Sequence, residues 1–152
     1  MKDLIIIGGL APDSVDIDIH SYRTVIAADS GYDTALRLGI RPDVIVGDFD
    51  STSLRAEFIG KGYNPCPADK DETDAELAIM HSSEYDLIGG GEGRIDHTLS
   101  LFTVFRRYTP PSIWYMRSDT VVSFSGEVIV EAPDGMPLSI FPLSSRLSLL
   151  QA

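Results

Sequence analysis

The sequence predicts an α/β fold: a mostly parallel sheet with helices on both faces, followed by part of an antiparallel β-sandwich domain. Two observations support this prediction. Over the first hundred residues, short β-branched runs alternate with helix signals, which is typical of a parallel sheet covered by helices. After Pro111, short β runs follow one another with turns between them and no helix. We therefore predict an α/β domain at 1–110 and an incomplete β domain at 111–152.

Four apolar runs predict the strands of the α/β domain. Each is short and rich in Ile, Leu, Val or Ala, as expected for a strand that is buried on both faces. The first run is too short to be a signal peptide or a membrane span. The predicted strands cover residues 4–7, 24–28, 44–46 and 86–88.

Helix signals lie between these strands and after the last one. Thr73 and Glu76 form a Thr-x-x-Glu capping box, which predicts a helix start. Gly39 ends the first predicted helix, and Pro110-Pro111 end the last. The predicted helices cover residues 32–38, 54–61, a segment that starts at Thr73, and 97–107.

The chain beyond Pro111 predicts only strands. Turn residues such as Asp134-Gly135 separate the apolar runs. The chain then ends in an apolar run that has no later strand to pair with, so we expect a truncated β domain. The predicted strands of this part cover residues 113–115, 121–124, 127–130 and 138–141.

Charge and cysteine content limit the classes of function. Asp and Glu number 23 against 12 Lys and Arg, which gives a net charge of −11 at pH 7. Nucleic acid and anionic membranes repel such a surface, so we expect neither as a partner. Cys66 is the only cysteine. It therefore forms no internal disulfide, which favours a cytoplasmic location.

Two aspartates directly follow the third predicted strand. Asp48 and Asp50 come after the apolar run 44–46, at the strand end where open α/β sheets bind their ligands. Two like charges ~4 Å apart repel by about 4 kcal/mol at an effective dielectric constant of about 20, so a cation must hold them together. Oxygen ligands favour Mg²⁺, whose shell is usually completed by substrate phosphates. The sequence therefore predicts a metal–nucleotide site.

A second acidic cluster precedes the helix that starts at Thr73. Asp71 and Asp74 lie three residues apart, and Lys70 stands beside Asp71. Acidic residues are also common in the first turn of any helix, where they interact with the helix dipole. Because Lys70 could meet a phosphate oxygen, we interpret Asp71 and Asp74 as functional residues.

A glycine run follows the fourth predicted strand and leads into Arg94 and Asp96. Backbone amides in the run, such as those of Gly90 and Gly91, can approach a phosphate closely because no side chain stands in the way. The run does not match Gly-x-Gly-x-x-Gly, and the chain contains no Gly-Lys-Ser/Thr. The planar guanidinium of Arg94 suits a phosphate clamp. Asp96 fits a helix cap and a substrate contact equally well.

Together these segments resemble the thiamine pyrophosphokinase family. The resemblance implies transfer of a pyrophosphoryl group from Mg-ATP to the hydroxyl of thiamine, with release of AMP. It also implies an α/β catalytic domain and a thiamine-binding β-sandwich domain, in a homodimer. The matching runs occur in the family's order and are 28–31, 39–43, 47–51, 69–74 and 93–99.

The resemblance also implies roles for individual residues. Asp48, Asp50 and Asp71 would hold Mg²⁺ and the ATP phosphates, and Asp74 or Asp96 would orient the attacking hydroxyl. The late part of the family's β domain, which completes the thiamine pocket, has no match in this chain. The remaining contacts with nucleotide or substrate are expected from Asp29, Ser30, Lys70, Gly90, Gly91 and Arg94.

Three alternatives remain open. Asp48 and the residues after it also fit the Asp-x-Asp-x-Thr pattern of haloacid-dehalogenase-like phosphatases. A pterin pyrophosphokinase of related fold would differ only in its acceptor, and a non-catalytic module would bind nucleotide without turnover. Formation of AMP with different acceptors separates these alternatives.

Overall fold

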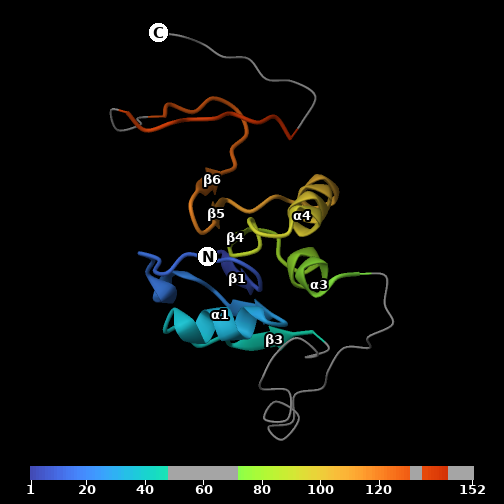
Figure 1. The fold of residues 1–152 in the computed structure, drawn as a ribbon. Helices are drawn as coiled ribbons and strands as arrows, with labels where there is room; N and C mark the ends of the chain where they lie inside the picture. The colour runs from blue at the N-terminus through green and yellow to red at the C-terminus, as the bar shows by residue number, and fades with distance from the viewer. Residues whose placement is uncertain (48–71, 131–134, 144–152) are drawn as a thin grey trace, which may run out of the picture.

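The computed structural model describes residues 1–47, 72–130 and 135–143 of the chain (Figure 1). Its centre is a six-stranded sheet with the order β3-β2-β1-β4-β5-β6, in which β1 to β5 run parallel and β6 pairs antiparallel with β5. The strands are β1 (Asp3–Ile7), β2 (Val25–Ala28), β3 (Val44–Val46), β4 (Tyr85–Ile88), β5 (Ile113–Tyr115) and β6 (Thr120–Val122). The helices are the 3-10 helix η1 (Ile19–Ser21), α1 (Gly31–Arg37), α3 (Asp74–Met80) and α4 (Ile95–Arg107).

Alternating side chains of β1 divide the core into two layers. Leu4 and Ile6 belong to the layer that contains α1, whereas Ile5 and Ile7 belong to the layer that contains α3 and α4 (Figure 1). The strand is apolar on both sides because both faces of the parallel sheet are covered. The predicted α/β fold with helices on both faces is therefore confirmed. Within the described residues, no helix has the length and apolar character needed to cross a membrane.

The sheet extends past the domain boundary that the sequence predicts at residue 110. β5 pairs in parallel with β4, with Trp114 opposite Leu87, and β6 then adds an antiparallel edge. The helix α4 serves as the crossover between β4 and β5, so the strand after it continues the same sheet. β5 and β6 therefore belong to the same sheet as β1 to β4, and the division into two domains stays a prediction.

Beyond β6 the described residues 123–130 and 135–143 form no strand. The predicted strands at 127–130 and 138–141 are therefore not present there. Ile129 and Phe141 are 86% and 73% exposed, so no second sheet covers these runs within the described residues. The β-sandwich domain remains a prediction, and the predicted helix at 54–61 lies outside the described residues.

Gly31 determines how closely α1 approaches the sheet. A Cβ at this position would overlap the carbonyl oxygen of Ile6 in β1. Only glycine allows the first turn of α1 to pack directly on the backbone of the neighbouring strand. The start of α1 is thereby placed at the carboxyl end of β1, beside the loop that follows β2.

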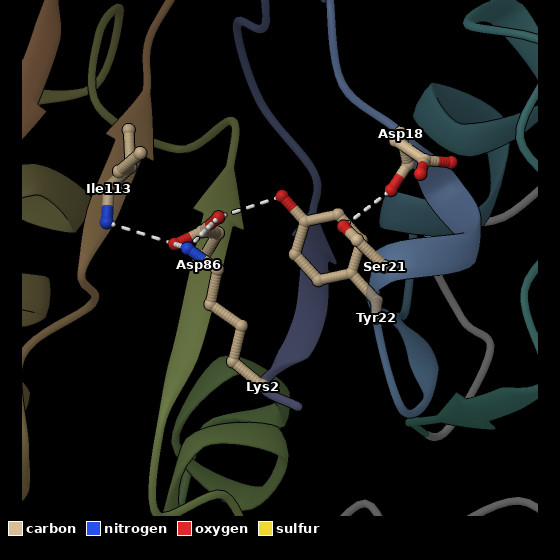
Figure 2. A network of polar contacts seen from close by, with 6 residues as sticks. All are labelled: Lys2, Asp18, Ser21, Tyr22, Asp86 and Ile113. Carbon is tan, nitrogen blue, oxygen red and sulfur yellow. Dashed lines mark hydrogen bonds and ion pairs between the residues drawn. The ribbon is translucent and has the colours of Figure 1, made fainter.

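A buried carboxylate ties the start of the chain to β4 and β5. Asp86 is 1% exposed and accepts hydrogen bonds from Lys2 Nζ (2.8 Å), Tyr22 Oη (2.7 Å) and the Ile113 amide (3.1 Å), as Figure 2 shows. Burial and the hydrogen bond to Asp86 raise the pKa of Tyr22 far above its ordinary value, so its hydroxyl remains a donor. Because both carboxylate oxygens have partners, Asp86 serves the fold.

Candidate functional site

The strand order places the topological switch point of the sheet between β1 and β4. From β1 the chain proceeds to β2 and β3 on one side of the sheet, whereas β4 to β6 lie on the other side. Open α/β sheets bind their ligands at such a point, outside the carboxyl ends of the two central strands. Gly8-Gly9 follow β1 and the glycine run 89–91 follows β4, so both lie at the switch point. A Cβ on Gly9 would lie 3.6 Å from the Gly90 Cα, which brings the two loops into contact.

The loop after β4, residues 89–93 and hereafter the glycine loop, is held by hydrogen bonds to its neighbours. The Gly89 amide donates to the Tyr115 carbonyl oxygen (3.0 Å), and the Gly90 amide donates to the Leu10 carbonyl oxygen (3.1 Å). The Gly90 N–H therefore already has an acceptor within the protein, whereas the sequence predicts that this N–H approaches a phosphate. The loop nevertheless lies at the predicted edge of the sheet.

Asp29 follows β2 and has an unusual conformation. Its φ is 48°, the only positive value for a non-glycine residue in the described part of the chain. Its amide donates to the Val46 carbonyl oxygen (2.8 Å), and a Cβ on Gly47 would lie 3.2 Å from its Cα. Asp29 therefore lies against the end of β3, next to the point where the chain leads into Asp48.

One oxygen of the Asp29 carboxylate is buried without a partner. Among the described residues, Oδ1 of Asp29 is the only buried side-chain oxygen or nitrogen that has no hydrogen-bond partner. An unpaired polar atom of this kind costs about 1–3 kcal/mol. The positive φ of a non-glycine residue adds strain of about 1–2 kcal/mol. Backbone strain and an unpaired oxygen at this edge of the sheet make Asp29 a candidate ligand-binding carboxylate.

Ser30 connects this position to the end of β1. It occupies the N-cap position of α1, but its side chain makes no capping hydrogen bond. A Cβ on Gly8 would overlap the Ser30 Oγ, so the hydroxyl lies against the loop that follows β1. Asp29 and Ser30 therefore lie at the carboxyl edge of the sheet, as the sequence predicts.

Arg94 and Asp96 form an ion pair at the start of α4. Arg94 Nε donates to Asp96 Oδ1 (3.1 Å), and Arg94 Nη2 donates to the second carboxylate oxygen. Their side chains are 69% and 59% exposed. The hydrogen bonds from Arg94 lower the pKa of Asp96, which keeps that carboxylate ionised near neutral pH. The predicted clamp and the predicted acid are thus adjacent and open to solvent.

Asp74 lies in the first turn of α3, which packs on the sheet. The capping box is confirmed on one side, because Thr73 Oγ1 accepts from the Glu76 amide (3.1 Å). Glu76 is buried and accepts from Arg107 Nη1 (2.9 Å), which joins α3 to α4. Glu76 therefore stabilises the helix pair, and Asp74 remains the acidic candidate of this turn.

Four predicted site residues lie outside the described residues. In the described ranges, no group of three or more His, Cys, Asp or Glu side chains is placed to hold a metal ion. The predicted metal ligands can therefore be located only from the neighbouring chain: β3 ends at Val46, shortly before Asp48. These four residues are Asp48, Asp50, Lys70 and Asp71.

Two side chains that sequence reasoning left out of the site contact the glycine loop. Trp114 Nε1 donates to the Gly89 carbonyl oxygen (2.7 Å), and Thr98 Oγ1 donates to the Gly91 carbonyl oxygen (3.2 Å). The sequence contains one weak signal for the first contact, since a buried indole N–H needs an acceptor.

Comparison with known proteins gives consistent results. Residues 18–114 match the sequence model of the family described as thiamin pyrophosphokinase, catalytic domain. The fold is similar to a thiamin pyrophosphokinase from Geobacillus thermodenitrificans, with 26% identity and a TM-score of 0.57 over 77% of this chain and 60% of that one. A thiamin pyrophosphokinase family protein from Enterococcus faecalis gives 25% identity and a TM-score of 0.53 over 69% and 54% of the two chains.

A protein from Lactobacillus plantarum is similar to the same degree, with 26% identity and a TM-score of 0.51 over 76% and 61% of the two chains. The chain thus spans between 54% and 61% of the length of these three solved proteins. No curated protein sequence matches it.

Proposed function

The chain belongs to the thiamin pyrophosphokinase family, and on that premise we propose that it contributes to transfer of a pyrophosphoryl group from Mg-ATP to the hydroxyl of thiamine. AMP is the second product. The substrates bind at the carboxyl edge of the sheet, where the loops after β1, β2 and β4 meet. We further propose that the protein works as a cytoplasmic homodimer.

The observation that carries this proposal is the unpaired buried oxygen of Asp29. A carboxylate oxygen with no partner in the described structure suits a ligand that brings a positive charge or a hydrogen-bond donor. Hydrated Mg²⁺ brings both. The strained backbone of Asp29 supports the same conclusion, because strain of this kind clusters at ligand-binding sites.

The proposed Mg²⁺ ligands are Asp48, Asp50 and Asp71, with Asp29 facing the same site. Carboxylate oxygens are the donors that Mg²⁺ prefers, so the residue types fit this ion. When bound, Mg²⁺ neutralises charge on the phosphate oxygens of ATP. Lys70 lies between Asp69 and Asp71 in the sequence and would add a positive charge for the phosphates.

Arg94 and Asp96 act as an exchangeable pair. Because both side chains are largely exposed, solvent screens their attraction and little stability is lost when they separate. The Arg94 fork can therefore leave Asp96 and bind phosphate oxygens in a bidentate manner. Asp96 is then free to accept the hydrogen bond of the thiamine hydroxyl and to orient it for in-line attack, a role for which Asp74 is the other candidate.

The proposal is tested by incubating the protein with Mg²⁺, ATP and thiamine and separating the nucleotides by chromatography. We expect AMP in an amount that depends on thiamine, together with thiamine diphosphate. A pterin alcohol replaces thiamine in a parallel reaction, and a third reaction contains no acceptor. Phosphate release without acceptor would instead indicate a phosphatase. AMP formed only with the pterin would identify the pterin alcohol, and not thiamine, as the acceptor.

Binding of ATP is measured separately by equilibrium dialysis with labelled nucleotide. The wild type is expected to bind ATP in a Mg²⁺-dependent manner. Absence of both ATP binding and AMP formation would refute the proposed function.

A further inference from the structure

The indole of Trp114 is placed to act on the glycine loop. Trp114 lies on β5, is 1% exposed, and donates from Nε1 to the Gly89 carbonyl oxygen at 2.7 Å. Gly89 is the first residue after β4, the strand that pairs with β5. The hydrogen bond therefore runs from the core to the point where β4 becomes the loop.

Aromatic contacts hold the indole in this position. The ring of Phe105 lies edge-on to it at a centroid distance of 5.2 Å and an interplanar angle of 82°. Phe102 makes a second edge-on contact at 5.9 Å and 71°. Both phenylalanines belong to α4, the helix that the glycine loop precedes. The Trp114 N–H is thus directed by packing that is fixed before any ligand binds.

The other loop anchors differ in kind. The Gly89 and Gly90 amides donate to backbone carbonyl oxygens, which no substitution removes. Besides Trp114, only Thr98 is seen to donate a side-chain hydrogen bond to this loop among the described residues, from Oγ1 to the Gly91 carbonyl oxygen. The conformation of the loop can therefore be altered through these two side chains.

We propose that Trp114 is a positioning residue for nucleotide binding, which acts by holding the glycine loop through the Gly89 carbonyl. The proposal rests on the proposed function, since the loop forms one wall of the site for ATP. Without the indole N–H, the Gly89 carbonyl oxygen has lost its donor, and the glycine loop shifts in the absence of ATP to give it another. ATP binding must then return the loop to its original conformation, in which this oxygen has no donor. The affinity for ATP falls accordingly.

The test compares Trp114→Phe, which keeps an aromatic ring and removes the N–H, with Ile40→Val. Ile40 is buried in the core layer that contains α1, whereas Trp114 belongs to the other layer, so its variant controls for general damage to the core. Two quantities are measured: the Kd for ATP in the presence of Mg²⁺, and native-state hydrogen exchange at the Gly89 and Gly90 amides relative to β1 amides.

We expect Trp114→Phe to raise the Kd by about 2- to 10-fold, the range expected from one buried hydrogen bond. Exchange at the two loop amides should accelerate relative to β1. Ile40→Val should lower overall stability and leave the Kd and the relative loop exchange unchanged. The proposal requires both changes in Trp114→Phe, so an unchanged Kd or an unchanged relative exchange overturns it, as does an equal effect in Ile40→Val.

A second pair of variants applies if Trp114→Phe does not fold. Thr98→Val removes the side-chain donor to Gly91, and Thr98→Ser retains it. Thr98→Val should accelerate loop exchange and weaken ATP binding, and Thr98→Ser should restore both. If neither variant changes ATP binding, the loop is not positioned by its side-chain anchors and the proposal fails. If the wild type binds ATP and the variants have the same Kd, only this inference is refuted. If the wild type binds no ATP, both the proposed function and this inference are refuted.

Discussion

The unpaired carboxylate of Asp29 predicts that a substitution will make the ligand-free protein more stable while it weakens ligand binding. Asp29→Gly removes the buried Oδ1, whose lack of a partner costs about 1–3 kcal/mol. It also relieves the strain of a φ of 48°, which is about 1–2 kcal/mol for a non-glycine residue. The greater freedom of glycine in the unfolded chain opposes these gains by about 0.5–1 kcal/mol. We therefore expect a net increase of about 1–4 kcal/mol in the free energy of unfolding.

Urea unfolding followed by circular dichroism measures this change. With a denaturant dependence of about 2 kcal/mol per molar, the midpoint should rise by about 0.5–2 M. Affinity for ATP in the presence of Mg²⁺, measured by equilibrium dialysis, should fall about tenfold or more, which corresponds to about 1.4 kcal/mol.

Asp43→Gly is the matched control for this experiment. The Asp43 carboxylate accepts a hydrogen bond from the Val25 amide at 2.8 Å, so its removal should destabilise the protein by about 1 kcal/mol. The two aspartates lie at opposite ends of the same strand pair and should change stability in opposite directions. If Asp29→Gly also destabilised the protein by 1 kcal/mol or so, Oδ1 would have a stabilising partner and the reasoning would be refuted.

Three further predictions concern the fold and the site. Gly31→Ala should lower the free energy of unfolding by about 1–3 kcal/mol in urea unfolding, because a Cβ overlaps the backbone of β1; a neutral result would mean that α1 can shift freely. Tyr22→Phe should cost about 1–3 kcal/mol in the same assay, since Asp86 loses a buried donor, and equal stability would contradict that role. Arg94→Gln should raise the pKa of Asp96 toward its ordinary value of 3.8, as followed by NMR titration. In the wild type, the lowered pKa of Asp96 stabilises the folded state at pH values above the pKa of this residue in the unfolded chain. This stabilisation is lost as the pH falls through the pKa of Asp96 in the folded protein. An unchanged pKa of Asp96 in Arg94→Gln would show that Arg94 is not the cause of the lowered pKa.

Local sequence signals were sufficient to place the elements of the sheet but not its limits. The strand at Val44–Val46 was predicted to the residue from its β-branched run, but the expectation that it is buried on both faces was wrong: β3 is an edge strand, and Val44 is 42% exposed. The run at Ile113–Tyr115 was also predicted to the residue and yet assigned to another domain. A period-2 pattern shows that a segment is a strand, whereas its partner is chosen by the crossover before it, which the pattern does not contain.

The candidate site was predictable to the same extent. Asp29 and Ser30 were expected in the site through the family resemblance, and their position directly after β2 puts them at the carboxyl edge of the sheet. The partner of the Gly90 amide, the Leu10 carbonyl, lies 80 residues away in the chain and has no local signature. For the same reason, no local signal connects Trp114 with the site: the acceptor of its N–H becomes apparent only when β4 and β5 are paired.

The hydrogen bonds of the glycine loop change how phosphate recognition should be understood in this protein. A loop that binds phosphate through its amides needs N–H groups that point into the site, yet the Gly89 and Gly90 amides are directed at Tyr115 and Leu10. These two amides therefore hold the loop against its neighbours and help to fix where α4 begins. Arg94 occupies the N-cap position of that helix, so a rigid loop fixes the backbone from which the guanidinium reaches out. Under the proposed function, affinity for the phosphates depends on the charges of Arg94, Lys70 and bound Mg²⁺, and the glycines contribute by keeping Arg94 in place.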